Sequence, residues 1–365
     1  MSSIGLDASY IVGVNPTGIA GYSRRLIESL AALPTSHRFF LCYRLSRWPQ
    51  RRQFLRPAVA GGSPISVRLY QEPLTFWLPW EIDLFHSLAQ RPPAFSFKHE
   101  VVTIHDVFPI TGPDYSTPEF QRKFSRLLRQ ALARSERILV LSEYTACQLV
   151  RHCAVDRERI RVVPGGVDLP VETLSSEACL EERERLVGKG CEMLLTLGVL
   201  DNRKNVVTAL RVLQLLPERY KLVLAGGNGY GSEAIHAYIA SQKLEPRVRC
   251  LGHVPADRIP VLYQSASALL FPSLEEGFGF PLLEAMAYGL PVVTSNTSAL
   301  PEVGGDAALY ADPGDPSDIA SKVCSAVEDA DLRSGLIRRG HRRARQFPWR
   351  RTAQETLKVY RELIA

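Results

Sequence analysis

The segment SALLFPSLEEGFGFPLLEAMAY, residues 267–288, contains the clearest structural signal in the chain. Its apolar start at 267–273 predicts a buried strand. A glycine-rich loop follows at 275–280. Pro281 suits the first position of a helix that runs to about Tyr288, because proline has no backbone N–H that would need a partner there. A strand, a glycine loop and a helix start therefore follow one another directly.

This helix start is suited to bind an anion. Free backbone N–H groups from about Phe278 to Leu283 point outward there, with the positive end of the helix dipole behind them. Such an arrangement is a ready-made site for a phosphate or a diphosphate. Gly277 and Gly279 allow the backbone to approach the ligand closely.

Two carboxylates flank the same helix start. Glu276 precedes the helix and Glu284 is expected in its first turn, so the two would straddle a ligand bound there. Carboxylates accept paired hydrogen bonds from neighbouring hydroxyl groups. A nucleotide sugar offers such hydroxyls on both sides of a diphosphate, on the ribose and on the sugar. The competing interpretation is a plain turn followed by acidic residues that favour the helix dipole.

Strand and helix patterns alternate along the whole chain, and continuous apolar runs indicate parallel strands covered on both faces. Expected strands lie at 4–8, 38–43, 65–70, 101–105, 137–142, 193–198, 220–225, 247–251, 267–271, 291–294 and 307–310, and segment 159–168 is expected to hold a further strand followed by a Pro-Gly-Gly turn. Expected helices lie at 21–33, 117–133, 143–151, 176–187, 204–216, 231–242, 256–265, 281–289 and 315–329, with further helix in the last forty residues.

This rhythm predicts an α/β protein of two doubly wound, parallel-sheet domains, at 1–168 and 169–347. Ligands of such domains bind at the carboxyl ends of the strands. The amphipathic segment 348–365 is expected to form a terminal helix that packs on its own domain or returns to the first.

Length and composition exclude several classes of protein. At 365 residues the chain exceeds one comfortable hydrophobic core, which favours two domains. No run approaches the ~18 apolar residues of a transmembrane helix, and the first residues do not resemble a signal peptide. Seven cysteines are scattered without a C-x-x-C pair, which argues against disulfides and a zinc site. We therefore expect a cytoplasmic protein.

The net charge of +6 is unevenly placed, because arginines concentrate in segments 44–56 and 122–137. One interpretation is a solvated basic face. The other is contact with a phosphate-bearing acceptor or an anionic membrane, which would place the protein peripherally at the inner membrane face. No module of nucleic-acid recognition is present, so we expect no nucleic-acid partner.

Two adjacent cations, Arg203 and Lys204, follow the strand expected at 193–198. At the carboxyl end of a strand they can neutralise a departing diphosphate, although a solvated loop is the alternative. Asp329 and Asp331 have the spacing of the D-x-D motif of metal-dependent transferases, but not its expected position in the fold. They lie at a helix junction where Asp331 is expected to be an N-cap, so we expect no metal there.

The first half offers its own candidates. Gly18 and Gly21 lie between the first strand and the first helix, again a glycine loop that opens a helix. His105 and Asp106 directly follow a strand. A lone histidine is often structural, but at a strand end beside an acid it is also a candidate for substrate contact.

Motifs spread over nearly the whole chain resemble those of one family. They are TGIAGY (17–22), TIHDVFP (103–109), LVLSEYTACQL (139–149), VVPGGVD (162–168), LGVLDNRKN (197–205), LVLAGGNG (222–229), LGHVP (251–255), the block from FPSLEEGFGF to ALYADP (271–313), and FPWRRTA (347–353). On these motifs the chain resembles the retaining glycosyltransferases of family four, mannosyl- and rhamnosyltransferase-type members in particular. The resemblance implies a GT-B fold, in which two Rossmann-like domains face each other across a cleft.

The family has a motif of two glutamates separated by seven residues, and it matches Glu276 and Glu284. The resemblance implies that Glu276 holds hydroxyls of the donor sugar, together with the backbone at Phe278 and Gly279. It implies that Glu284 binds the ribose. The glycine that ends strand 193–198 is followed in many members by arginine but here by Val199, which leaves the donor open.

The resemblance also assigns the diphosphate and the base. The backbone at Phe280 and Leu282 would contact the phosphates, with Arg203 and Lys204 on the diphosphate. Gly18 would lie near the phosphates and His105 near the sugar. The strand-end residues Gly252, His253 and Val254 would lie near the base. Members of the family need no metal.

The expected activity is therefore hexose transfer from a nucleotide-diphosphate sugar to a hydroxyl of a glycan or lipid-linked acceptor, in polysaccharide biosynthesis. The donor is a substrate and no cofactor is expected; GDP-mannose is the first choice and a UDP-sugar the second. Retention without an evident enzymic nucleophile favours front-face attack. The alternatives are a GT-B epimerase or phosphorylase, or a non-catalytic nucleotide-sugar-binding component of a synthesis complex.

Overall fold

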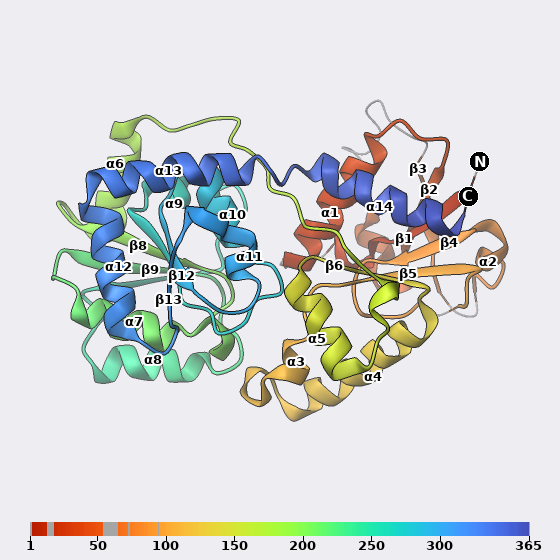
Figure 1. Ribbon diagram of the computed structural model, residues 1–365, viewed down its shortest axis with the longest axis horizontal. Helices are drawn as coiled ribbons and strands as arrows, with labels where there is room; N and C mark the ends of the chain where they lie inside the picture. Colours follow the sequence, from red (N-terminus) through yellow and green to blue (C-terminus); the bar gives the residue numbers. More distant parts are fainter. Residues whose placement is uncertain (1, 13–17, 54–64, 72–73, 94, 365) are drawn as a thin grey trace. The chain divides into compact units, whose positions relative to one another are not determined.

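The computed structural model describes residues 2–12, 18–53, 65–71, 74–93 and 95–364. The chain divides into two compact units. Unit 1 comprises Met1–Thr111, Pro118–Gly166 and Phe347–Ala365, and unit 2 comprises Gly112–Thr117 and Val167–Gln346. Each unit has a parallel sheet with helices on both of its faces (Figure 1). The prediction of two Rossmann-like α/β domains is confirmed.

Unit 1 contains a seven-stranded sheet in the order β3-β2-β1-β4-β5-β6-β7, and its neighbouring strands are parallel. The order changes direction at β1, which is the doubly wound pattern. The strands are β1 (Ser3–Asp7), β2 (Arg38–Tyr43), β3 (Ile65–Leu69), β4 (Leu84–Ser87), β5 (His99–Ile104), β6 (Arg137–Val140) and β7 (Ile160–Val162).

Helices cover both faces of this sheet. One face carries α1 (Gly18–Ala31) and α14 (Trp349–Leu363), which pack on each other. The other carries α2 (Leu78–Glu81), α4 (Pro118–Arg134) and α5 (Glu143–Cys153), whose apolar residues join two buried clusters with the strands. The short helix α3 (Phe108–Thr111) precedes α4 in the chain.

The last helix, α14, is fastened to unit 1 by buried polar contacts. The Tyr360 hydroxyl lies 2.6 Å from His86 Nδ1, and His86 Nε2 lies 2.8 Å from the Thr103 hydroxyl. Burial lowers the pKa of His86 to about 3, so this bridge contains a neutral imidazole. The Thr352 hydroxyl donates to the Pro164 carbonyl at 2.8 Å. The C-terminal helix is therefore an integral part of unit 1.

Unit 2 contains a six-stranded parallel sheet in the order β10-β9-β8-β11-β12-β13. Its direction changes between β8 and β11. The strands are β8 (Glu192–Leu197), β9 (Tyr220–Ala225), β10 (Val248–Gly252), β11 (Ala268–Phe271), β12 (Val292–Ser295) and β13 (Leu309–Ala311).

Two helical layers enclose this sheet (Figure 1). One holds α7 (Val206–Leu215), α8 (Ser232–Ser241) and α12 (Pro316–Glu328); the other holds α6 (Ser176–Val187), α9 (Ile259–Ser265), α10 (Phe280–Ala287) and α13 (Ala330–Ala344). The short α11 (Leu300–Gly304) precedes β13. The central strands are buried on both sides, which explains their uninterrupted apolar sequences.

The predicted strands and helices are confirmed to within a few residues, but β4 was not predicted. Leu84–Ser87 is short and half polar, so it lacks the apolar run of the other strands. It is fully buried all the same, because the polar ring of His86 has hydrogen-bond partners on both nitrogens. Within the part of the chain that the structure describes, no helix is long and apolar enough to cross a bilayer.

Candidate functional site

Two loops of unit 2 meet at the carboxyl edge of its sheet. One leads from β8 to α7 and the other from β11 to α10. The strands β8 and β11 are parallel neighbours, with Leu194 opposite Ala268. The loops are also bonded directly, since the Leu274 N–H donates to the Arg203 carbonyl at 2.8 Å. The fold thus brings together the two loops in which the sequence predicted a basic pair and a carboxylate.

Arg203, Lys204 and Glu276 form one buried ion-pair cluster. Lys204 Nζ lies 2.6 Å from Glu276 Oε1, and Arg203 Nη1 lies 2.9 Å from Oε2. Arg203 also donates to the Glu275 carbonyl at 2.6 Å, and Lys204 Nζ lies 4.6 Å from the centre of the Phe271 ring. Lys204 and Glu276 are each 8% exposed. Each oxygen of this carboxylate therefore faces a cation.

Burial and the neighbouring charges, including the Asp201 carboxylate 3.8 Å from Arg203, shift the pKa values of Glu276 and Lys204. Burial opposes ionisation of Glu276, but the charges of Arg203 and Lys204 outweigh it and lower the pKa of the carboxyl to about 2. The pKa of Lys204 is also lowered, by burial first, and Glu276 does not fully compensate because Arg203 repels the ammonium. A further anion beside Arg203 and Lys204, in addition to Glu276 and Asp201, would favour the charged forms of both cations, and a diphosphate supplies one.

The loop that presents the two cations is held by asparagine and aspartate. The Asp201 side chain accepts the Lys204 N–H at 3.0 Å and caps the short 3-10 helix Asn202–Lys204. Asn205 has a φ of +54°, a region in which asparagine is tolerated better than most residues. Its amide donates to the carbonyls of Pro272 and Pro313 at 3.1 and 2.9 Å. Asn205, for which the sequence suggested no role, thus ties the basic loop to its neighbours.

The sequence also did not predict a second support, which lies in the loop between β12 and α11. Ser298 has a φ of +59°, and its hydroxyl accepts the Glu276 N–H at 3.1 Å. The Glu276 carbonyl in turn accepts from the Ala299 N–H at 3.3 Å. The backbone of Glu276 is therefore fixed on both sides, which sets the direction of its carboxylate.

The start of α10 is shaped by Gly279. Its φ is +104°, and a Cβ there would lie 2.9 Å from Leu300 Cδ2, so glycine meets both a conformational and a spatial need. The helix begins at Phe280, with Pro281 as its second residue. The Leu282 N–H, one of the two amides predicted for the phosphates, donates to the Gly279 carbonyl at 3.1 Å.

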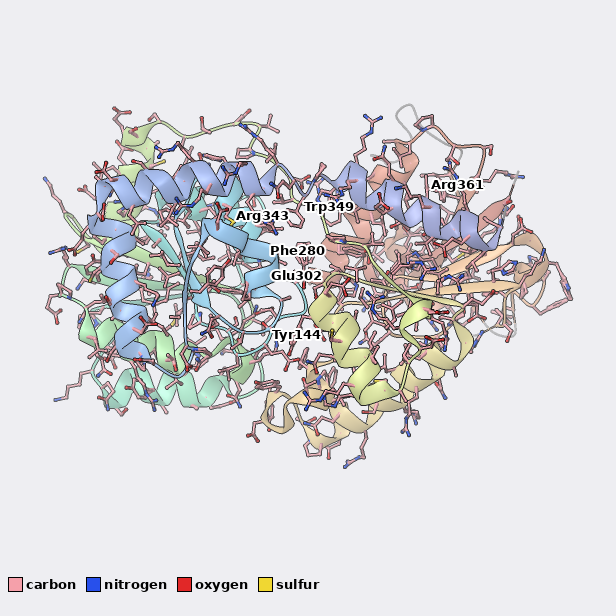
Figure 2. The ribbon with its side chains drawn as sticks, in the orientation of Figure 1. Tyr144, Phe280, Glu302, Arg343, Trp349 and Arg361 are labelled. Carbon is pink, nitrogen blue, oxygen red and sulfur yellow. The ribbon has the colours of Figure 1, made fainter. Side chains whose placement is uncertain are left out.

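The helix that packs against Gly279 is itself anchored. From α13, Arg343 donates to the backbone carbonyls of Glu302 and Val303 at 2.6 and 2.8 Å (Figure 2). These contacts hold α11, and with it Leu300, beside the glycine. The glycine turn before α10 therefore rests on a fixed element.

Glu284 lies in the second turn of α10, so its expected place in the first turn is wrong. The helix starts one residue before Pro281, which moves Glu284 along it. Its carboxylate accepts the Tyr263 hydroxyl at 2.7 Å. Burial raises the pKa of Glu284, and the nearby charge of Asp168 raises it further. The Tyr263 ring stacks on Tyr288 at 5.7 Å, and none of these three neighbours was predicted from the sequence.

Other glycines of the carboxyl edge allow close backbone contacts. A Cβ on Gly226 would lie 1.8 Å from the Gly198 carbonyl oxygen, so the loops after β8 and β9 touch only because residue 226 has no side chain. The half-exposed Val199 follows Gly198. At the end of β10, Gly252 has a φ of +66° and open space around its Cβ position, and the following His253 is exposed.

The candidates of unit 1 lie on separate elements. Gly18 and Gly21 lie in the first turn of α1 and not in a loop before it, so their predicted position is wrong, because the helix begins at Gly18. A Cβ at either glycine would meet nothing within 4 Å, and residues 13–17 lie outside the described residues. His105 follows β5 and is buried. Its Nε2 lies 2.9 Å from the Leu88 carbonyl, so this nitrogen carries the proton. Burial lowers the pKa of His105 to about 4, and Tyr22 packs edge-on against its ring at 4.8 Å. This histidine is a neutral hydrogen-bonding group near pH 7.

Asp329 and Asp331, which have the D-x-D spacing, lie at the start of α13. Asp329 caps α13 by accepting the Leu332 N–H at 2.9 Å, whereas Asp331 lies in the first turn. The expectation that Asp331 is the N-cap is therefore wrong. The capping position falls two residues earlier because α12 ends at Glu328. Among the described residues, no three His, Cys, Asp or Glu side chains gather closely enough to hold a metal ion.

Two family models match the chain. Residues 16–170 match Glycosyltransferase Family 4, and residues 181–343 match Glycosyl transferases group 1. The O-antigen chain mannosyltransferase B of Escherichia coli is 29% identical over 95% of this chain and 96% of its own. A D-inositol 3-phosphate glycosyltransferase of Corynebacterium jeikeium is 29% identical over 79% of this chain and 71% of its own.

Solved structures agree on the fold. The Anabaena protein HepE, in complex with UDP and glucose, has a TM-score of 0.76 at 19% identity, over 99% of this chain and 100% of its own. WaaG, a glycosyltransferase involved in lipopolysaccharide biosynthesis, has a TM-score of 0.72 at 16% identity, over 98% and 99% of the two chains. The GT-B architecture is thereby established.

Proposed function

Since the chain belongs to the family-four glycosyltransferases, with its first half matching Glycosyltransferase Family 4 and its second half Glycosyl transferases group 1, we propose that it transfers a hexose from a nucleotide-diphosphate sugar to a hydroxyl group of a glycan or lipid-linked acceptor. The observation that carries this proposal is the buried cluster of Arg203, Lys204 and Glu276 beside the start of α10. It supplies cations for a diphosphate and a rigid carboxylate for sugar hydroxyls, in one place.

Each group of the cluster has a separate task in this proposal. Arg203 and Lys204 neutralise the diphosphate as negative charge develops on the leaving group. Glu276 accepts hydrogen bonds from the donor sugar with the carboxylate that the two cations keep ionised. Glu284 accepts from the ribose hydroxyls, whose hydrogen bonds would offset the burial that raises the pKa of its carboxyl. The backbone at Phe278, Gly279 and Phe280 completes the contacts.

The reaction that we propose needs no metal, because the two cations take the place of one at the diphosphate. Configuration is retained by front-face attack, with the leaving phosphate as the base. Glu276 is then a clamp for hydroxyls rather than a nucleophile. Chelation of divalent ions is expected to leave turnover unchanged, and NMR of the product gives the anomeric configuration. A loss of turnover that added magnesium restores would contradict this mechanism.

For the donor we propose a GDP-mannose-like sugar first. The similarity to O-antigen chain mannosyltransferase B and the Asn-Arg-Lys-Asn sequence at 202–205 favour mannose. A UDP-sugar is the second choice, because HepE was solved with UDP and glucose. The acceptor that we propose is a growing polysaccharide or a lipid-linked glycan, as expected for a relative of an O-antigen enzyme.

For the basic segments we propose contact with an anionic membrane at its cytoplasmic face. Four of the six cations of the second segment are exposed on α4: Arg122, Lys123, Arg126 and Arg129. Residues 54–56 of the first segment lie outside the described residues. A lipid-linked acceptor would be presented at such a surface.

A panel of nucleotide sugars tests the proposal. Binding is scored by thermal shift, and turnover by nucleotide release with and without glycan acceptors. The proposal predicts one donor that both stabilises the protein and releases its nucleotide when an acceptor is present. Release of free or epimerised sugar without an acceptor would favour an epimerase. Binding without turnover on any acceptor would favour a non-catalytic nucleotide-sugar-binding component.

A further inference from the structure

A cluster of large apolar side chains is exposed around α2 of unit 1. Trp80 is 80% exposed, Phe76 62% and Leu74 57%, and Trp77 is half exposed. The Phe76 ring packs edge-on against both tryptophans, at 5.4 and 6.2 Å, so the rings form one continuous surface. We call Leu74, Phe76, Trp77 and Trp80 the aromatic patch. None of the residues predicted for donor binding belongs to it.

The patch stands on a firm base. Leu78 and Ile82 of the same segment are buried in a cluster with Phe85 and Phe40 of the sheet. Glu81, next to Trp80, forms an ion pair with Arg68 of β3. The inner side of the segment is therefore fully packed, and the aromatic rings are turned outward by that packing.

The aromatic patch and the basic helix α4 cover the same face of the sheet. Phe85 of β4 contacts the α2 cluster and pairs with Glu100 of β5. Val102 and Ile104 follow at alternate positions of β5, and they contact α4. Because alternate residues of a strand point to one face, α2 and α4 lie on the same face of the sheet.

The charge of unit 1, and of α4 in particular, fits an anionic surface. Unit 1 has 25 Lys and Arg against 14 Asp and Glu, a formal charge of +11, whereas unit 2 has 19 against 24, a charge of −5. On α4, four exposed cations stand against one exposed acid, Glu119. Basic residues beside exposed tryptophan and phenylalanine are the composition of surfaces that lie in the interface of a bilayer.

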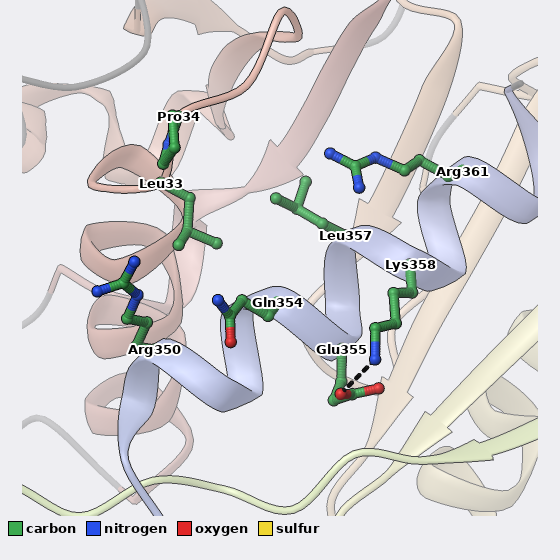
Figure 3. A pocket seen from close by; sticks show the side chains of 8 residues that line it. All are labelled: Leu33, Pro34, Arg350, Gln354, Glu355, Leu357, Lys358 and Arg361. Atoms are coloured by element: carbon green, nitrogen blue, oxygen red, sulfur yellow. Dashed lines mark hydrogen bonds and ion pairs between the residues drawn. The ribbon is translucent and has the colours of Figure 1, made fainter.

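The opposite face of unit 1 offers a contrast. Between the end of α1 and α14 there is an open pocket lined by Leu33, Pro34, Arg350, Gln354, Glu355, Leu357, Lys358 and Arg361 (Figure 3). It too has cations, but one of them, Lys358, is paired with Glu355 at 2.7 Å, and no tryptophan lines it. This face provides a matched control for charge without aromatic rings.

We propose that the aromatic patch is an interfacial membrane anchor, which inserts its rings between the headgroups of an anionic bilayer while the exposed cations of α4 contact the phosphates. The inference rests on the proposed membrane contact of the basic segments and extends it to a surface that contains no basic segment. Membrane binding is a property of unit 1 and does not require the donor site of unit 2.

Sedimentation with vesicles tests the anchor. We expect the protein to bind vesicles of phosphatidylcholine mixed with phosphatidylglycerol, and to bind pure phosphatidylcholine weakly. Trp80→Ser lowers the partition coefficient by about tenfold or more, since it removes one of the largest inserting side chains. Removing one cation, as in Lys123→Gln, lowers it by about fivefold at low salt. Tryptophan emission shifts to the blue on binding, and Trp77→Ser with Trp80→Ser abolishes the shift.

Three controls show whether vesicle binding comes from the aromatic patch itself. Leu74→Ser weakens binding, whereas Leu215→Ser on unit 2, at a side chain of nearly equal exposure (56%), leaves it unchanged. Arg361→Gln, on the opposite face, also leaves it unchanged. Glu276→Gln binds vesicles as the wild type does, even though we expect it to lose transfer. Binding that survives Trp80→Ser, or a dimer that Trp80→Ser dissociates in place of any vesicle binding, would overturn the inference.

Discussion

Replacement of Glu276 by glutamine tests whether charge holds the site together. The substitution keeps the shape of the side chain but removes the anion between Arg203 and Lys204. Loss of one partner from a buried ion pair costs about 3–5 kcal/mol, because the remaining charge stays buried. The two cations, acting against burial, shift the pKa of Glu276 from 4.5 to about 2, which corresponds to about 3 kcal/mol by linkage. We therefore expect Glu276→Gln to lose about 3 kcal/mol of unfolding free energy.

Urea unfolding followed by circular dichroism measures this loss. The matched control is Glu143→Gln, which removes an equally close ion pair: Glu143 lies 2.9 Å from Arg157, but the two side chains are 58% and 49% exposed. The control is expected to change stability by less than about 0.5 kcal/mol. Equal losses in the two variants would refute the reasoning. The same Glu276 variant should remain folded, since domains are usually stable by about 5–15 kcal/mol, and should lose most of its transfer activity.

The pH dependence of this loss has a definite sign. Because the pKa of Glu276 is lower in the folded protein, its contribution is fully present above about pH 4.5 and disappears as the pH falls toward 2. The difference in stability between the wild type and Glu276→Gln should therefore narrow over that interval. A difference that stays constant there would mean that the lost stability has another cause than the charge.

Three other substitutions have expected outcomes in the same unfolding assay. Gly226→Ala places a Cβ 1.8 Å from the Gly198 oxygen and should cost about 3 kcal/mol; wild-type stability would show that the two loops can separate freely. Asn205→Ala removes two hydrogen bonds at a left-handed residue and should cost about 2 kcal/mol, with Asn205→Gly recovering only the backbone part. Tyr360→Phe removes the hydroxyl at His86 and should cost about 1 kcal/mol, and no change would mean that α14 does not depend on this bridge.

The sequence predicted the architecture because local signals and packing agree in most of the chain. Buried parallel strands need apolar runs, and the segments at 220–225 and 267–271 show them plainly. The strand β4 was not predicted from the sequence. Its burial depends on two hydrogen-bond partners of His86, Thr103 and Tyr360, which are not its neighbours in the sequence. Long-range hydrogen bonding of this kind leaves no local pattern to read.

The sequence predicted which residues form the site, but not how these residues contact one another. Glu276 and the pair Arg203–Lys204 were expected to serve different parts of a ligand, yet in the structure they neutralise one another. That contact depends on the adjacency of β8 and β11, which no local pattern encodes. Asn205 and Ser298 were missed because a left-handed φ at these residues follows from tertiary contacts. The residues around Asn205 and Ser298 in the sequence indicated only a loop.

The aromatic patch was not predicted, because a local apolar pattern does not show which of its side chains will be exposed. A run such as LTFWLPWEI predicts burial when it is read alone, and only the structure shows that Leu78 and Ile82 are buried while Trp77 and Trp80 are exposed. Exposed aromatic side chains therefore became informative only when they could be compared with the face that the same segment buries.

The central claim is that Arg203 and Lys204 bind the diphosphate of a nucleotide sugar beside Glu276. Calorimetric titration of wild type and Lys204→Met with a nucleoside diphosphate and the matching monophosphate tests it most directly. The account predicts that the wild type prefers the diphosphate and that the variant loses about tenfold or more of that preference. The ratio between the two ligands removes any general effect of the substitution on folding. An unchanged preference for the diphosphate in Lys204→Met would contradict the account.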